Sequence, residues 1–242
     1  MQLNSLQAHV EDPLLWLRTV CAKGGLRITD AQLDLLRRYV ELLLEWNTKI
    51  NLISRKDTDK VWKSHILHCL SILFKVHLPD GIRMLDLGSG GGLPGIPLKI
   101  VVPSIDLLMV DATQKKTKVV SEMIVELGLS NAAVQWGRAE ELSKEKKLRG
   151  KFDIIVARGV GPLNELVALA HPFAAKGPGR SGGRTDPILL EPPCLLAYKG
   201  GDLTDELAKV RRDRRVHAVE VLPLAAEGID PAEEKKLVIV QL

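Results

Sequence analysis

The sequence predicts a doubly wound α/β fold with a mostly parallel sheet. Residues 82–102 read IRMLDLGSGGGLPGIPLKIVV: an apolar run, a glycine cluster and a second apolar run at helical spacing. This order predicts a strand, a tight turn and a helix. Short apolar runs then alternate with helical patterns, which is typical of a parallel sheet. Two last strand-like segments, 218–224 and 236–242, predict an antiparallel C-terminal strand.

The bulk properties suit one globular domain with an N-terminal extension. The chain has 242 residues, 45% of them apolar, and a net charge of +4, which is compatible with a nucleic-acid partner. Its three cysteines have no C-x-x-C spacing, so we expect reduced thiols, a cytoplasmic protein and no metal site. The sequence contains no signal peptide and no apolar stretch of 18 residues, which argues against a membrane location. We expect a helical extension at 1–80 and the main domain at 81–242.

The extension contains two predicted helices before residue 47. An amphipathic pattern within 1–30 should end at the glycine pair 24–25, and Thr29 or Asp30 should cap a stronger helix. The apolar stripe of that second helix, from Leu33 to Trp46, is better explained by packing on the main domain than by partner binding.

A polar connection, 47–54, precedes a third predicted helix, capped by Asp57 or Thr58. His65 and His68 lie three apart and share a face of it. A metal pair is one interpretation; a buried or hydrogen-bonded histidine, or an RNA contact, is favoured because a third ligand is missing. Arg55 opens a basic cluster for which phosphate contact and simple exposure are equally good explanations.

The rest of the main domain follows the alternating pattern. We expect strands at 105–110, 131–136, 152–157 and 194–198, and helices at 114–127, 164–173 and 204–215. The segment 176–187, KGPGRSGGRTDP, predicts a mobile loop, and its two arginines suit either RNA contact or plain exposure.

The glycine turn poses the first functional question. Gly90, Gly92 and Gly95 satisfy the dinucleotide pattern G-x-G-x-x-G, but Asp86 at the strand end would repel a pyrophosphate. S-adenosylmethionine carries an ammonium and a sulfonium, so an acid there helps to hold it. The pattern D-x-G-x-G-x-G, formed by Asp86, Gly88, Gly90 and Gly92, therefore favours S-adenosylmethionine over NAD or a purely structural turn.

The carboxyl ends of the next strands supply further candidates, because ligands of such sheets bind there. Asp111 follows the second strand, about twenty residues after the turn, and can accept hydrogen bonds from ribose hydroxyls. Ala139 and Glu140 follow the third strand and can border the adenine. Arg158 ends the fourth strand, where it suits a phosphate, the methionyl carboxylate, a base edge or a local salt bridge.

Several blocks together resemble one known family. They are WNTKINLISRKD, HILHCL, MLDLGSGGGLPGIPLKI, GRAEEL, FDIIVARGVGPLNEL and LLAYKG. In this order they are similar to the bacterial glucose-inhibited division protein B family, the small-subunit ribosomal RNA methyltransferase G family, from about residue 35 to the C-terminus. The resemblance implies a Rossmann-like class I methyltransferase that moves a methyl group from S-adenosylmethionine to ring nitrogen seven of a guanine in 16S ribosomal RNA.

The resemblance also assigns roles to residues. It implies cofactor contacts from Gly88, Leu93, Asp111, the Ala139–Glu140 pair and Arg158, and RNA-facing or active-site roles for the basic residues Arg138, Arg158 and Lys199. We expect Arg158 to act by positioning, because guanine nitrogen seven carries a free lone pair and its methylation needs no obligatory general base. The partner would be 16S ribosomal RNA or the small ribosomal subunit, and the protein a monomer.

Two departures and two alternatives accompany this interpretation. Members often carry an acid where this chain has His68, and the 176–187 loop looks longer and richer in arginine than is usual. An NAD-dependent oxidoreductase on a similar fold is one alternative, disfavoured by Asp86. A non-catalytic RNA-binding module is the other, disfavoured by the intact glycine turn and Asp111.

Overall fold

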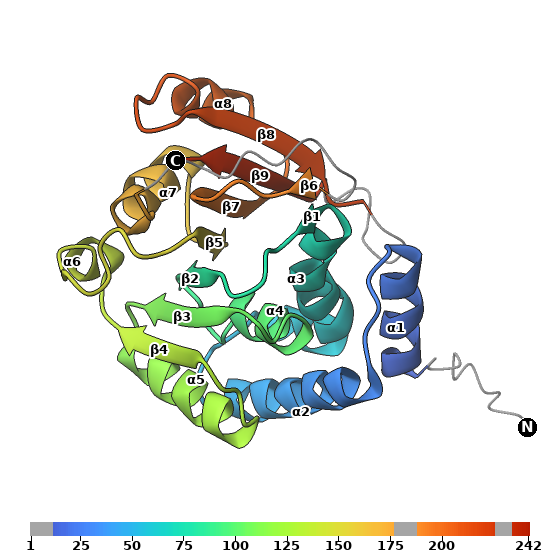
Figure 1. Ribbon diagram of the computed structural model, residues 1–242. Helices are drawn as coiled ribbons and strands as arrows, with labels where there is room; N and C mark the ends of the chain where they lie inside the picture. The colour runs from blue at the N-terminus through green and yellow to red at the C-terminus, as the bar shows by residue number, and fades with distance from the viewer. Residues whose placement is uncertain (1–11, 177–187, 226–233) are drawn as a thin grey trace, which may run out of the picture.

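The computed structural model describes residues 12–176, 188–225 and 234–242 and contains a seven-stranded sheet between two layers of helices (Figure 1). The strand order is β4-β3-β2-β5-β7-β9-β8, with β9 antiparallel to both neighbours and the other pairings parallel. The predicted fold class is confirmed. The strands of the sheet are β2 (Arg83–Leu87), β3 (Asp106–Asp111), β4 (Ala132–Trp136), β5 (Ile154–Arg158), β7 (Cys194–Lys199), β8 (Ala218–Pro223) and β9 (Lys236–Gln241).

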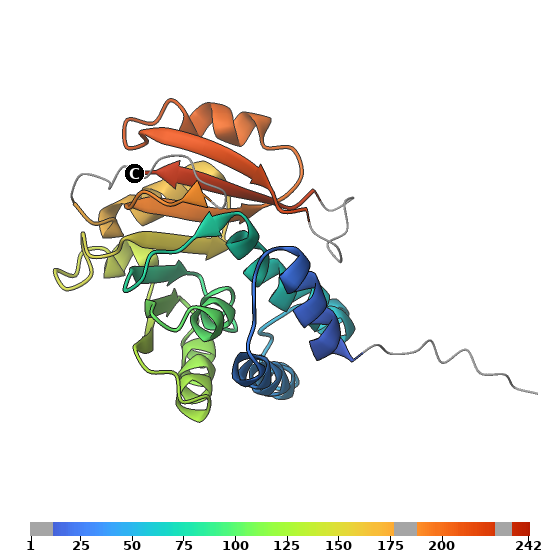
Figure 2. The ribbon, with the colours of Figure 1, turned by 45° about the vertical axis from the view of Figure 1, so that its right-hand side comes forward.

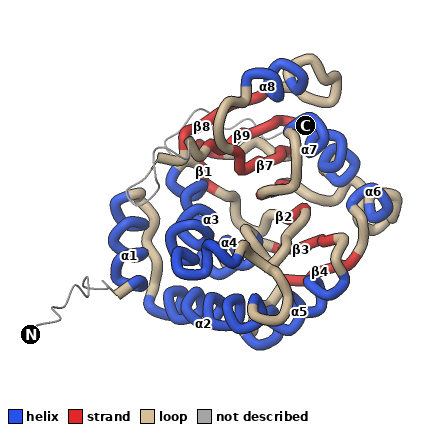
Figure 3. Tube along the Cα trace, turned by 180° about the vertical axis from the view of Figure 1, so that it is seen from behind, coloured by secondary structure: helices blue, strands red, loops and turns tan. Residues whose placement is uncertain are grey.

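Each face of the sheet has its own hydrophobic core, because successive side chains of a strand point to opposite faces. On one face, Met84 and Val156 pack with the N-terminal helices, α4 and α5; on the other, Leu85 and Ile155 pack with α6, α7 and α8. Figure 3 shows the helices on both sides from behind. The helices are α1 (Pro13–Lys23), α2 (Asp30–Asn47), α3 (His68–Leu70), α4 (Gly95–Val101), α5 (Gln114–Glu126), α6 (Ala139–Leu142), α7 (Leu163–Ala170) and α8 (Thr204–Val210).

The first helix ends, and the second begins, where the sequence predicts. Gly24 follows α1 as its C-cap, and Thr29 caps α2 in a capping box with Gln32. The side chain of Gln32 also donates to the carbonyl of Val101 at 2.9 Å, which ties α2 to the end of α4. In Figure 2, α1 and α2 (blue) lie on the same side of the sheet as α4 (green). The start of the first predicted pattern lies outside the described residues.

The third predicted helix is irregular, and its predicted cap is wrong. Ser54, not Asp57 or Thr58, accepts the capping N–H, from Lys56 at 3.3 Å. The chain then runs through a 3₁₀ turn, a π-helical turn, one α turn and a second 3₁₀ turn, with bounds η1 (Arg55–Lys60), η2 (Trp62–Leu67), α3 (His68–Leu70) and η3 (Ser71–Phe74). Single π turns are frequent at functional sites.

Three other features differ from the sequence prediction. Strands β1 (Val76–His77) and β6 (Ile188–Leu189) form a separate parallel pair that the sequence does not predict. The helix expected at 204–215 ends at Val210, so the arginines at 211–215 follow it, and Arg215 pairs with Asp213 at 2.6 Å. A 3₁₀ turn, η4 (His171–Phe173), completes the helix expected at 164–173. The loop predicted at 176–187 lies almost wholly outside the described residues. In the described parts of the chain, no helix is long and apolar enough to cross a membrane.

Lys99 on α4 supports the turn into β3 from inside the protein. Its side chain is 3% exposed, and Nζ donates to the carbonyls of Pro103 at 2.7 Å and Ile105 at 2.5 Å. Lys99→Met keeps the length but leaves both carbonyls without a donor, so we expect unfolding free energy to fall by about 2 kcal/mol. Urea denaturation measures the loss, with exposed Lys118→Met as the matched control. Equal stability of the two variants would contradict this role.

Candidate active site

The glycine turn folds back over the end of the neighbouring strand β3. The N–H groups of Gly88 and Ser89 both donate to the carbonyl of Val110, at 2.9 and 3.1 Å. Gly88 and Gly90 have φ of +72° and +57°, the left-handed region that glycine enters without strain. Leu93, one of the predicted cofactor residues, is buried in this turn, and its N–H donates to Ser89. The turn therefore presents backbone, not side chains, at the carboxyl edge of the sheet.

Asp111 joins three of the predicted segments. Its Oδ2 accepts the N–H of Gly90 at 2.9 Å, and its Oδ1 accepts the N–H of Thr113 at 2.8 Å. Its carbonyl accepts the N–H of Gly137 at 3.1 Å, which draws the start of α6 to the same edge. A carboxylate oxygen has two lone pairs, so each oxygen keeps one for a ligand hydroxyl.

The predicted residues after β4 lie at the rim of this edge. Ala139 and Glu140 open α6, with Ala139 half-buried and Glu140 exposed. Arg138, directly before them, is exposed. Trp136 is 55% exposed, and its Nε1–H donates to the carbonyl of Ala112 at 3.1 Å, so the indole is fixed beside Asp111.

Asp86 is fully buried beneath the turn. Its Oδ2 accepts the N–H of Gly95 at 2.8 Å, and a Cβ at Gly95 would lie 2.7 Å from that oxygen. Oδ1 has no hydrogen-bond partner, and the same holds for the buried hydroxyl of Ser89. Burial raises the pKa of Asp86 to about 7, while the charge of Arg158 opposes the rise. An unpartnered buried carboxylate oxygen beside a glycine turn fits a cationic ligand group.

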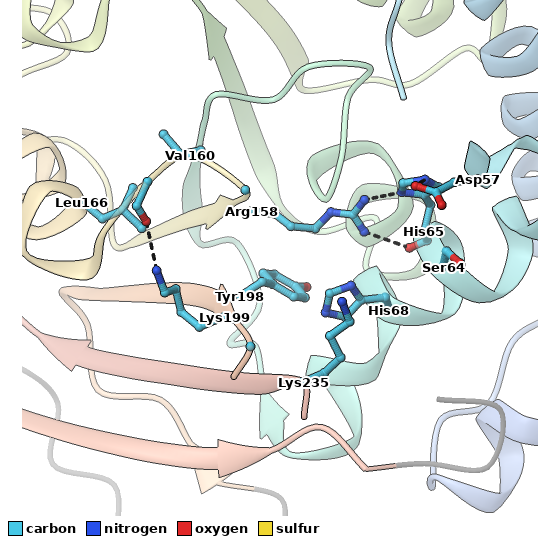
Figure 4. Close-up of a pocket in the computed structure, with 13 residues that line it drawn as sticks. Asp57, Ser64, His65, His68, Arg158, Val160, Leu166, Tyr198, Lys199 and Lys235 are labelled. Carbon is cyan, nitrogen blue, oxygen red and sulfur yellow. Dashed lines mark hydrogen bonds and ion pairs between the residues drawn. The ribbon is translucent and has the colours of Figure 1, made fainter. Parts of the chain in front are cut away.

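A cavity of about 450 Å³ lies beyond the carboxyl ends of β5 and β7. One wall comes from η1, η2 and α3, and the side chains that matter most are Asp57, His65, His68, Arg158, Val160 and Tyr198 (Figure 4). Val160 also touches the glycine turn, since a Cβ on Gly88 would lie 2.7 Å from its Cγ2. The cavity and the turn are thus direct neighbours.

Arg158 crosses the cavity wall from the end of β5 to the N-terminal segment. Its guanidinium contacts Nδ1 of His65, the carbonyl of His65 at 3.4 Å and Sγ of Cys69 at 3.5 Å. Burial, assisted by the charge of Arg158, lowers the pKa of His65 to about 4 and that of His68 to about 3. Both imidazoles are therefore neutral at pH 7.

The β7 side of the cavity is held by the polar contacts of two side chains, Tyr198 and Lys199. The hydroxyl of Tyr198 donates to the carbonyl of Cys69 at 2.6 Å, and its ring meets His68 edge to face at 5.3 Å. Lys199 contacts Glu206 at 2.7 Å and the carbonyl of Gly161 at 3.0 Å. The charge of Lys199, a predicted RNA contact, is thus balanced within the protein.

The structure brings most of the predicted residues to one edge and adds others. Asp86, the turn, Asp111, the α6 start and Arg158 converge, whereas Arg55 is exposed at the start of η1. Sequence reasoning found the two histidines but not the contact of His65 with Arg158, and it missed Tyr198. It also missed Tyr39 of α2, whose buried hydroxyl donates to the carbonyl of Gly91 at 2.9 Å. Among the described residues, no three His, Cys, Asp or Glu side chains converge in a way that could hold a metal ion.

Comparisons with known proteins identify the family of this chain. The family described as rRNA small subunit methyltransferase G matches residues 32–181. The ribosomal RNA small subunit methyltransferase G of Chlorobium luteolum is 39% identical over 96% of this chain and 90% of its own length. That of Chlorobaculum tepidum is 36% identical over 96% and 99%. The solved CurJ carbon methyltransferase is 14% identical and covers 96% of this chain and 71% of its own chain, with a TM-score of 0.52. This similarity shows the fold alone.

The family match covers more than half of the chain, and the two relatives align along almost all of it. The match confirms the family that the motifs of the sequence indicate, and neither alternative function is favoured by it. The chain belongs to the rRNA small subunit methyltransferase G family.

Proposed function

We propose that this protein transfers a methyl group from S-adenosylmethionine to ring nitrogen seven of a guanine in 16S ribosomal RNA. Its family membership makes it an S-adenosylmethionine-dependent ribosomal RNA methyltransferase. The observation that carries the finer proposal is the contact between the glycine turn and the cavity through Gly88 and Val160. A donor held in the turn and a base held in the cavity would be adjacent, as methyl transfer requires.

The residues of the turn suit S-adenosylmethionine. We assign the ribose to Asp111, the ammonium to the unpartnered oxygen of Asp86, and backbone contacts to Gly88, Gly90 and Leu93. Ala139 and Glu140 would border the adenine. When bound, the cofactor supplies an electrophilic methyl group on a positively charged sulfur.

The cavity suits the guanine because its walls carry hydrogen-bond donors. The edge of guanine that bears nitrogen seven presents two acceptors, N7 and O6. Arg158 can donate to O6 of this edge, which leaves the lone pair of N7 free to attack, or to the methionyl carboxylate, and the neutral ring of His68 lines the same cavity. Burial raises the pKa of Cys69 to about 11, so this thiol stays protonated and is a poor nucleophile. Catalysis then rests on alignment and electrostatics.

The RNA would approach the carboxyl edge of the sheet. Arg138 and Arg55 are exposed and suit phosphates, which predicts salt-sensitive binding. Lys199 would act mainly as a wall of the cavity because Glu206 balances its charge. The guanine must leave its stack to enter.

Four further assignments stay proposals of the same kind. They are a monomer, the small ribosomal subunit as the assembled partner, a cytoplasmic location, and a division into a helical extension at 1–80 and a methyltransferase domain at 81–242. The shared core between residues of α2 and α4 means that the extension packs directly on the domain.

Mass spectrometry of 16S nucleosides from cells with and without the protein tests the function. We expect N7-methylguanosine to disappear on deletion and to return when the gene is restored. Purified protein should transfer labelled methyl groups to 16S RNA or to the small subunit from the deleted strain. Unchanged N7-methylguanosine together with failure in vitro would reject the proposal. Thermal stabilisation by NAD but not by S-adenosylhomocysteine would favour the oxidoreductase.

The raised pKa of Asp86 predicts that cofactor binding releases a proton. Its carboxyl, with a pKa of about 7, is about half protonated at pH 7, and an ammonium beside it favours the ionised form. Binding should therefore release roughly half a proton at pH 7, and affinity should fall as the pH drops from 7 to 6. Calorimetry in buffers of different ionisation enthalpy measures the release.

The matched variants are Asp86→Asn and Asp106→Asn, the second exposed at the amino end of β3. Only Asp86→Asn should abolish the proton release, because an asparagine oxygen still accepts from Gly95 but does not titrate. Proton release of the same size in both variants would show that a group other than Asp86 titrates.

A further inference from the structure

The side chain of Arg158 is held by the N-terminal segment rather than by the sheet from which it projects. Arg158 ends β5, yet its three hydrogen-bonding contacts go to His65 and Cys69, at sequence separations of 93 and 89 residues. A guanidinium has five N–H donors, so these contacts leave two for a ligand in the cavity. What fixes His65 therefore fixes the direction of the remaining donors.

The chemistry of the contact determines the protonation state of His65. A guanidinium only donates, so Nδ1 of His65 must be the acceptor, and the ring proton of the neutral imidazole must lie on Nε2. Nε2 is buried and has no hydrogen-bond partner, but Oδ2 of Asp57 lies 3.6 Å from it. A carboxylate at that side favours a proton on Nε2 and disfavours one on Nδ1.

These contacts form a directed chain from Asp57 on η1, through His65 on η2, to Arg158 at the end of β5 (Figure 4). His65 is 7% exposed, so the imidazole cannot turn freely into solvent. The carbonyl of the same residue holds Nη1 at 3.4 Å, which fixes the guanidinium at a second point. Two points of contact define an orientation, whereas one would only define a distance.

We propose that Asp57 and His65 are positioning residues that hold Arg158 in its working orientation in the cavity. The inference rests on the proposed function only in taking Arg158 to face the substrates. It assigns the N-terminal segment a role in methyl transfer: Asp57 sets the tautomer of His65, and that tautomer accepts from Arg158. Arg158 itself remains the group that contacts a substrate.

Substitutions at His65 separate positioning from packing. An asparagine oxygen can occupy the place of Nδ1, so His65→Asn keeps an acceptor, whereas His65→Leu removes it. We expect His65→Leu to lower kcat roughly 30-fold, the loss of one hydrogen bond to a charged group, with S-adenosylmethionine affinity within about twofold of wild type. His65→Asn should recover activity to within about fivefold of wild type. Equal losses in both variants would overturn the proposal.

Asp57→Asn tests the tautomer. The new amide can donate to Nε2, which favours a proton on Nδ1 and directs it at Arg158. We expect kcat to fall roughly tenfold, while Asp59→Asn, exposed in the same 3₁₀ turn, has wild-type activity. In an Arg158→Ala background, His65→Leu should add little further loss, because residues that act as a unit are not additive. Additive losses would contradict the chain of contacts.

A measurement that does not depend on methylation distinguishes the positioning proposal from the proposed function. Long-range ¹H–¹⁵N spectra of histidine-labelled protein at pH 7.5 should show His65 protonated on Nε2 in the wild type and on Nδ1 in Asp57→Asn. That result would support the positioning even if the protein failed to methylate 16S RNA, which would reject the proposed function instead. A proton on Nδ1 in the wild type would overturn the positioning.

Discussion

Arg158→Ala is expected to lower kcat for methylation of 16S RNA by roughly 100-fold or more while the protein stays folded. The guanidinium lines the cavity that we assign to the guanine, and its charge partly offsets the burial that raises the pKa of Asp86. Removing one preorganised donor from an active site lowers kcat by about 10²–10³. The side chain is only partly buried, so its loss should leave the sheet intact.

Two comparisons make this result specific. Arg158→Lys keeps the charge but not the planar fork that meets two acceptors of His65, so we expect it to stay at least about tenfold below wild type. Arg83→Ala, at the opposite end of neighbouring β2, removes an exposed arginine far from the carboxyl edge and should leave turnover unchanged. Single-turnover methylation with tritiated S-adenosylmethionine measures all three. Full activity of Arg158→Ala would show that Arg158 has no role in the site.

The sheet could be predicted from the sequence because its signals are local. Each strand is a short apolar run next to a helix with its own periodicity, and Gly128, at φ +62°, ends α5 where the pattern stops. The segment 55–74 could not be predicted, since its backbone passes through four short helical segments and changes helical type three times. The β1–β6 pair joins two residues to two others more than a hundred positions away. Such short pairings leave no pattern in either segment.

The candidate site likewise contains residues that the sequence could identify and residues that it could not. Asp86, Asp111 and Arg158 were found because each ends a strand, and strand ends of a parallel sheet meet at one edge. His65, Tyr198 and Tyr39 act through contacts across 93, 129 and 52 positions, and no local spacing encodes these contacts. Tyr39 sits in a stripe of leucines and looks like an ordinary core residue until its hydroxyl is seen to reach Gly91.

The N-terminal segment therefore contributes to both halves of the site. Tyr39 donates to the glycine turn, and a Cβ on Gly91 would lie 2.8 Å from Leu43 and 3.1 Å from Leu52. The side chain of Asn47 accepts the N–H groups of Leu52 and Ile53, at 2.8 and 3.0 Å, and so fixes the loop that covers the turn. On the other side, His65 contacts Arg158. An extension that packs this way is structurally part of the edge that carries the candidate site.

Asp111→Ala is expected to weaken S-adenosylmethionine binding roughly 100-fold. The carboxylate is held in place by the N–H groups of Gly90 and Thr113, and each oxygen keeps a lone pair for a ribose hydroxyl. Loss of two hydrogen bonds to a charged group corresponds to about 3 kcal/mol, or two decades in Kd. Loosening of the turn at Gly90 adds to the effect, because the backbone contacts of the ligand depend on it.

Calorimetry with S-adenosylmethionine and S-adenosylhomocysteine tests this, with two variants as references. Asp111→Asn keeps one acceptor but turns an amide N–H toward either Gly90 or Thr113, so its affinity should lie between those of wild type and Asp111→Ala. Asp106→Ala removes the other carboxylate of β3, at the amino end of the strand, and should bind as wild type does. Both ligands should lose affinity equally, because they share the adenosine that Asp111 would hold. Unchanged affinity in Asp111→Ala would contradict the assignment of the ribose to Asp111 at the end of β3. It would also contradict the proposal that the glycine turn binds S-adenosylmethionine.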